Sequence, residues 1–190
     1  IRSLEEYNGV WSLSIGANNE PGPIILSGSF SDAWPDNLHI AVVDIPEHSI
    51  IDDFPNRNLN INKNLNMGYD LKLVAGDEVY VREMAEKILS DIPKEYSLSQ
   101  NYPNPFNPET VISYQLPDPG DVTLEIFDIN GQRVTTLVEE FRQAGAYEVQ
   151  WRGENAKGHP VATGVYFYKL EHVGLSGDSD RFMGKMLLLR

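Results

Sequence analysis

The chain has 190 residues, of which 41% are hydrophobic, and its formal net charge at pH 7 is −13. Both halves are acidic, so neither offers the positive stripe that a nucleic-acid backbone or an anionic membrane surface would attract. The chain contains no cysteine, which excludes disulfides and thiolate metal sites. This composition predicts a folded acidic protein that does not bind nucleic acid.

No apolar run approaches the roughly 20 residues that a membrane-spanning helix needs, so we expect no membrane insertion. The sequence does not begin with methionine, and no signal peptide is recognisable at its start. We therefore expect the chain to be a C-terminal piece of a longer exported protein, with the upstream cargo domain missing from it.

The first half of the chain has the pattern of short strands separated by turn residues. Aromatic and β-branched residues alternate with polar ones, as is typical of a β-sandwich. The predicted strands cover residues 10–17, 23–30, 38–45, 49–52, 58–63 and 69–74. Residues 1–93 are therefore predicted to form a β-sandwich domain of uncertain family.

A short helix is predicted near the linker, over residues 78–90. Its apolar residues recur at helical spacing, and they are Val81, Met84, Ala85, Ile88 and Leu89. Asp77 is the expected N-cap, and the helix should end before Pro93.

The second half opens with the run NYPNPFNPET, Asn101–Thr110. Each proline fixes its own φ and pushes the preceding residue toward extended geometry, so we expect a stiff extended arm. The asparagines can satisfy neighbouring backbone groups, as turn residues do. Phe106 is the one large apolar side chain among the prolines and asparagines after Tyr102, and it is the expected anchor of the arm.

Alternating strands follow this run. They are predicted over residues 110–116, 121–128, 132–138, 145–151, 164–170 and 185–190. The Asn130-Gly131 pair is typical of a type I′ hairpin turn, in which both residues have positive φ. About seven strands in 95 residues correspond to an immunoglobulin-like sandwich. The predicted fold class is thus all-β: two tandem antiparallel immunoglobulin-like β-sandwiches with a short helix near the linker.

Catalytic and metal-binding motifs are weak. Asp128 begins a stretch that resembles a calcium loop, but a plain hairpin turn explains the same residues. The four histidines have no zinc spacing, and no nucleophile or phosphate-loop motif occurs. We expect no enzymatic activity and no cofactor. Trp34 could stack on a sugar from a sandwich loop, although a tryptophan in such a loop more often covers an edge of its own core.

The motif order is more specific than any single motif. The Asn-Pro run is followed by VTLEIFDINGQRVTTLV, then AGAYEVQW, GVYFYKL and the terminal GKMLLLR. This order resembles the type A C-terminal sorting domain of the type IX secretion system, over residues 96–190. The loop His172–Phe182 is longer and more acidic than is usual in that family.

The resemblance implies a seven-stranded sandwich without catalytic activity. Such a domain directs secretion across the outer membrane of Gram-negative Bacteroidota, by way of the periplasm, and surface attachment or release of the cargo. The implied partners are the translocon, a shuttle protein and a sortase, and the implied location is secreted or at the cell surface. The positions assigned to translocon recognition are Asn104, Pro105, Phe106, Asn107, Pro108, Gly131, Gly164, Tyr166, Lys185 and Arg190.

The terminal strand, nearly continuous in apolar residues, could also pair with a receptor by strand addition. Two other functions remain open. The chain could be a carbohydrate-binding or adhesive module of a secreted enzyme, centred on Trp34. It could also be a structural scaffold like the hook-cap immunoglobulin-like domains, whose hairpin and GVYFY pattern is similar.

Overall fold

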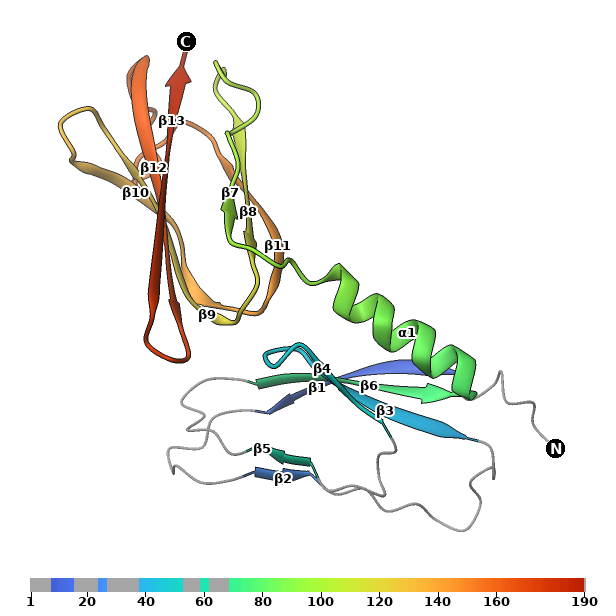
Figure 1. Ribbon diagram of the computed structural model, residues 1–190. Coiled ribbons are helices and arrows are strands. Elements are labelled where there is room, and N and C mark those ends of the chain that lie inside the picture. Colours follow the sequence, from blue (N-terminus) through green and yellow to red (C-terminus); the bar gives the residue numbers. More distant parts are fainter. Residues whose placement is uncertain (1–7, 16–23, 27–37, 53–58, 62–68, 190) are drawn as a thin grey trace. The chain divides into compact units, whose positions relative to one another are not determined.

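The computed structural model describes residues 8–15, 24–26, 38–52, 59–61 and 69–189. The chain divides into two compact units, Ile1–Ile92 and Pro93–Arg190. Antiparallel strands make up both units, with a single helix in the described part (Figure 1). The predicted all-β class with a short helix near the linker is therefore confirmed.

The first unit contains a four-stranded antiparallel sheet in the order β1-β6-β3-β4. These strands are β1 (Gly9–Ile15), β6 (Tyr69–Gly76), β3 (His39–Asp44) and β4 (Ser49–Ile51). A separate two-stranded sheet pairs β2 (Ile24–Leu26) with β5 (Leu59–Ile61). β3 is buried from Ile40 onward, because it lies between β6 and β4 and α1 packs against it.

Helix α1 (Glu78–Asp91) packs against β3 and β6 of this sheet (Figure 1). Its buried residues are Val81 and Ala85, two of the positions with helical spacing. The Asp77 side chain accepts a hydrogen bond from the Tyr80 N–H at 2.9 Å. The N-cap prediction is confirmed, because this bond satisfies one of the N–H groups left unpaired at a helix start.

The second unit consists of two antiparallel sheets (Figure 1). One sheet has the order β10-β9-β12-β13, and the other has the order β11-β8-β7. The strands are β7 (Ser97–Leu98), β8 (Thr110–Leu116), β9 (Gly120–Phe127), β10 (Arg133–Arg142), β11 (Gly145–Trp151), β12 (Gly164–Gly174) and β13 (Ser179–Leu188). Alternate residues of β8, β9 and β12 enter one apolar core, including Tyr114, Leu124 and Leu170.

The last hairpin corrects the expectation of a long acidic loop at His172–Phe182. β12 and β13 pair as far as Val173 opposite Ser179, so only the turn between Gly174 and Asp178 lies outside the ladder. His172 is fully buried and pairs with Asp180. Pairing with β12 and the burial of His172 therefore override the polar composition of this stretch.

The turn after β9 is not type I′, because among the described non-glycine residues only His48 has a positive φ. Within this turn, only Gly131 is in the left-handed region, with φ 77°. The Asp128 N–H donates to the Gln132 carbonyl at 3.0 Å, and one Asp128 carboxylate oxygen accepts from the N–H groups of Asn130 and Gln132, both at 2.9 Å. This geometry is a three-residue loop with glycine at the left-handed position.

Candidate recognition surface

The Asn-Pro loop, residues 101–110, is a closed loop and not the extended arm that the proline pattern predicted. Tyr102 and Val111 exchange two backbone hydrogen bonds of 2.9 Å, which bring the ends of the loop together. Inside the loop, the buried Asn101 side chain donates to the Thr110 hydroxyl at 2.8 Å and to the Pro103 carbonyl at 3.1 Å. The peptide bonds before all three of its prolines are cis.

This loop is hydrogen-bonded to the end of the terminal strand β13. The Phe106 N–H donates to the Leu187 carbonyl at 3.0 Å, and the Leu189 N–H donates to the Phe106 carbonyl at 2.9 Å. Between them, the Leu187 N–H donates to the Asn104 side-chain oxygen at 2.9 Å. The loop thus supplies β13 with a second neighbour on the side opposite β12.

The hydrogen-bonded part of the β13 edge begins at Lys185, whose carbonyl accepts a hydrogen bond from the Gln100 side chain at 2.9 Å. An incoming strand cannot use the groups from the Lys185 carbonyl to the Leu189 N–H, because they already have partners. The prediction that GKMLLLR offers its edge for strand addition is therefore wrong for this stretch.

Phe106 anchors the loop in the core, with 2% of its surface exposed. Its ring lies 5.6 Å from the Trp151 ring, which in turn meets the Tyr166 ring edge-on at 5.3 Å. The Trp151 indole N–H donates to the Glu154 carbonyl, and the Tyr166 hydroxyl donates to the Ala162 carbonyl. Phe106 and Tyr166 therefore hold the fold together and are not displayed on the surface.

A second aromatic contact ties the start of the loop to β13. The Tyr168 hydroxyl donates to the Ser99 carbonyl at 2.9 Å and accepts from the Asn101 N–H at 3.2 Å. Its ring lies where a Cβ on Gly184 would be. Burial raises the pKa of the Tyr168 hydroxyl above its ordinary value, so this hydroxyl remains a donor at neutral pH.

The remaining predicted residues fall into three groups. Exposed side chains around the anchored phenylalanine are Asn104, Pro105, Asn107, Pro108 and Lys185. Gly164 belongs to the same region, since it pairs with Leu188, which forms a bridge with Phe106. Gly131 lies elsewhere, in the exposed β9–β10 turn. Arg190 and Trp34 fall outside the described residues.

Sequence reasoning missed a charged network across β10, β9, β12 and β13. Arg133 and Lys169 approach the Glu125 carboxylate at 2.9 and 3.1 Å, and Lys169 and Arg181 approach Glu171 at 3.4 and 2.8 Å. Burial alone would raise the pKa of Glu125, but hydrogen bonds from Arg133 and Lys169 outweigh it and lower that pKa. The register between neighbouring strands brings these side chains together, so no local sequence motif predicts the pairs.

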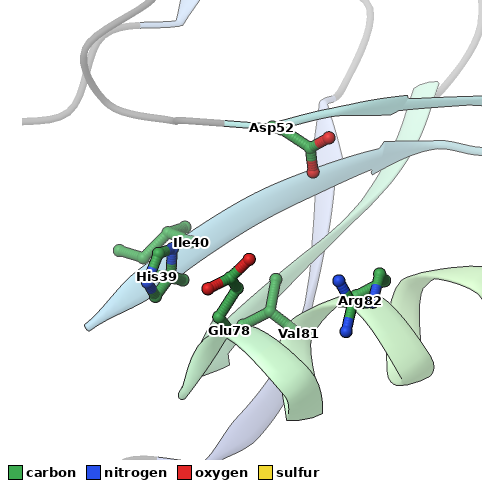
Figure 2. A pocket seen from close by; sticks show the side chains of 6 residues that line it. All are labelled: His39, Ile40, Asp52, Glu78, Val81 and Arg82. Carbon is green, nitrogen blue, oxygen red and sulfur yellow. The ribbon is translucent and has the colours of Figure 1, made fainter. Parts of the chain in front are cut away.

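A pocket of about 430 Å³ lies in the first unit, between α1 and the ends of β3 and β4 (Figure 2). It brings together His39, Asp52, Glu78 and Arg82. No hydrogen bond or ion pair joins these four in the described structure. Among the described residues, no three metal-ligating side chains gather as a metal site. None of the helices in the described part is long and apolar enough to cross a membrane.

Comparison with known proteins supports the fold of the second unit. A family model, the FlgD Ig-like domain, matches residues 103–174. It corresponds to the hook-cap rival considered from the sequence. No curated protein matches the chain.

Solved structures give more distant similarities. FlgD from Xanthomonas campestris is 21% identical with a TM-score of 0.36, over 50% of this chain and 65% of that one. Dimeric latent PorU from Porphyromonas gingivalis is 19% identical with a TM-score of 0.42, over 83% of this chain and 13% of that one. PorZ of the same organism, described as a surface component of its type-IX secretion system, is 19% identical with a TM-score of 0.33, over 63% and 14%.

This chain therefore spans less than two thirds of each of these proteins. The family match and the two packed sheets agree on an immunoglobulin-like β domain in the second unit.

Proposed function

We propose that the second unit is a non-catalytic sorting domain that directs a larger bacterial protein through type IX secretion to the cell surface. One observation carries the proposal. The Asn-Pro loop and the terminal strand, the two most characteristic motifs of that family, hydrogen-bond to each other through Asn104, Phe106 and Leu187. Motifs more than 80 residues apart thus form a single surface at the end of the chain.

This surface suits a label that other proteins recognise. Its buried part, Phe106 and Trp151, fixes the loop, while Asn104, Asn107 and Lys185 remain exposed. A receptor can bind such a surface after the cargo has folded, because binding to it requires neither a cavity nor a reacting group. The partners in this proposal are the translocon, its shuttle protein and a sortase that releases or attaches the cargo.

A structural scaffold is the second candidate, and the FlgD Ig-like match over residues 103–174 favours it. In that case the second unit would serve as a rigid module in an assembly and would carry no export information. The carbohydrate-binding alternative depends on Trp34, which lies outside the described residues.

A secretion assay separates these candidates. The whole chain is fused behind a signal peptide and a folded reporter, and expressed in a host with type IX secretion and in the same host lacking the translocon. The proposal predicts reporter on the surface of the first host and in the periplasm of the second. Equal surface delivery in both hosts, or periplasmic retention in both, contradicts it.

A truncation provides the second arm. Removal of Gly184–Arg190 deletes the strand residues that the Asn-Pro loop covers, so the truncated fusion should stay in the periplasm. Gly184→Ala, which disturbs the fold without removing the terminus, shows how much of that effect comes from unfolding. A polysaccharide titration that quenches tryptophan fluorescence would instead favour the carbohydrate module.

A further inference from the structure

The edge of β13 is hydrogen-bonded over only part of its length, to the Asn-Pro loop, and β7 also contacts this strand. Both backbone groups of Leu187 point away from β12, since they bond to the Asn-Pro loop. In an antiparallel ladder every second residue points the same way, so Met183 and Arg181 also direct their N–H and C=O groups outward. Nothing in the described part of the chain hydrogen-bonds to these outward groups. We call the stretch Ser179–Met183 the open edge.

The side chains beside the open edge alternate in character. Arg181, Met183 and Lys185 lie on one face of β13, because side chains two apart share a face. Met183 is 67% exposed, and the Arg181 side chain is 65% exposed even though it pairs with Glu171. This face therefore presents a basic, an apolar and a basic side chain in succession.

A shallow apolar groove of about 440 Å³ continues from Met183 across the sheet. Phe127, Phe167 and the β9–β10 turn also line it, and Ile129 in that turn is 70% exposed. The ammonium group of Lys169 lies 5.5 Å from the centre of the Phe127 ring at the side of the groove, where it also pairs with Glu125 and Glu171. The groove and the open edge meet at Met183.

We propose that the open edge binds an extended acidic segment of a partner protein by strand addition. The backbone of that segment would pair with Arg181 and Met183, as added strands pair with exposed sheet edges. Carboxylates at two positions four residues apart would face Arg181 and Lys185, and the apolar residue midway between them would reach the groove. This inference rests on the proposed function, in which the partner is an export receptor.

Charge also argues against a second copy of this chain as the occupant. Antiparallel pairing of two open edges about Met183 would place Arg181 of one copy opposite Lys185 of the other. Like charges directly opposite each other destabilise a strand pair, and basic residues on an edge strand commonly prevent such association. The same residues favour a strand that carries negative charge.

The test uses a synthetic peptide with glutamate, leucine and glutamate at alternating positions, titrated into the whole ¹⁵N-labelled chain. We expect amide shifts at Arg181, Met183 and Lys185, and none with a peptide that carries lysine in place of glutamate. Lys185→Glu should weaken binding about fivefold, the size of one exposed cross-strand charge pair. Lys157→Glu, the same change at an exposed turn of the second unit, should leave binding unchanged.

Met183→Pro is the sharper variant. It removes one outward N–H and leaves the bonds to β12 intact, since that N–H does not face β12. Binding should fall below detection while the hairpin amide signals persist. Unchanged binding by both variants, or shifts that map away from β13, overturns the inference.

Met183→Pro in the reporter fusion separates this inference from the proposed function. Delivery of the unmodified fusion together with retention of Met183→Pro supports both. Equal delivery of the two fusions overturns the role of the open edge and leaves the sorting function standing. Retention of the unmodified fusion overturns the sorting function. The peptide titration then tests, independently of secretion, whether the open edge binds an acidic strand.

Discussion

The ring of Tyr168 fills the space that a side chain at Gly184 would need. Both residues lie in the β12–β13 ladder, where they pair directly. The hydroxyl of Tyr168 is held by Ser99 and Asn101, so the ring cannot turn away without breaking these bonds. Glycine at this position of GKMLLLR is therefore required by close packing of the hairpin.

Gly184→Ala should destabilise the second unit by about 1–3 kcal/mol, the usual range for overpacking a filled core. Thermal unfolding measures the loss. Gly164→Ala is the matched control, because a Cβ there meets no atom within 4 Å. Equal melting temperatures for the two variants would contradict the packing described for Tyr168.

Phe106→Ala should cost about 3–5 kcal/mol, because it leaves a cavity beside Trp151 and frees the Asn-Pro loop from the core. Tyr102→Ala, in the same loop but 81% exposed, should change stability little. Chemical denaturation of both variants checks the difference. A stable Phe106→Ala variant would move this residue from the core to a receptor-facing role.

Residues 93–190 should fold without the first unit. Every member of the core cluster that includes Phe106 and Tyr168 lies in this stretch, and so do both of its sheets. The fragment should therefore unfold in one cooperative transition. A broad, non-cooperative transition would show that the second unit depends on contacts with residues before Pro93.

His172 should titrate below its ordinary range. Burial lowers its pKa from 6.5, although the nearby carboxylates of Asp118 and Asp180 partly oppose the effect. The ring lies 5.0 Å from Tyr96, whose own pKa burial and the Asp118 charge raise to about 12. An NMR titration should place the pKa of His172 below 6.5, and its signal should be absent in His172→Phe. A value at or above 6.5 for His172 would contradict its burial.

The consequence for stability has a definite sign. Above pH 6.5 His172 is neutral in both the folded and the unfolded chain, so it adds no pH dependence. As the pH falls below 6.5, the unfolded chain takes up the proton first, and the free energy of unfolding decreases until the lowered pKa is reached. His159→Gln, at an exposed position, should keep this decrease, whereas His172→Phe should remove it.

Local patterns predicted the elements of the fold well. The alternation in Thr110–Leu116 became a strand with every second residue buried. Asp77 capped the helix because a cap is a contact between residues three positions apart. Phe106 was recognised as an anchor because no neighbour in its segment could share that role. In each case the structure is determined either by contacts between residues close in the sequence or by the burial of apolar side chains.

Long-range pairing could not be read from the sequence. The Asn-Pro loop looked extended because its partner, Leu187, is 83 residues from Asn104. The stretch before the last strand looked like a loop because its ladder partner is β12, whose length local composition did not reveal. The Glu125–Lys169 pair likewise depends on the register between β9 and β12. Such contacts follow only once the sheet order is known.

Surface delivery of a reporter fused to residues 93–190 alone tests the central claim most directly. The account predicts that this unit carries the signal, so the reporter should reach the surface as completely as with the whole chain and should remain in the periplasm when the translocon is absent. Periplasmic retention of this fusion, in a host that delivers the fusion with the whole chain, would show that the signal is not contained in the second unit.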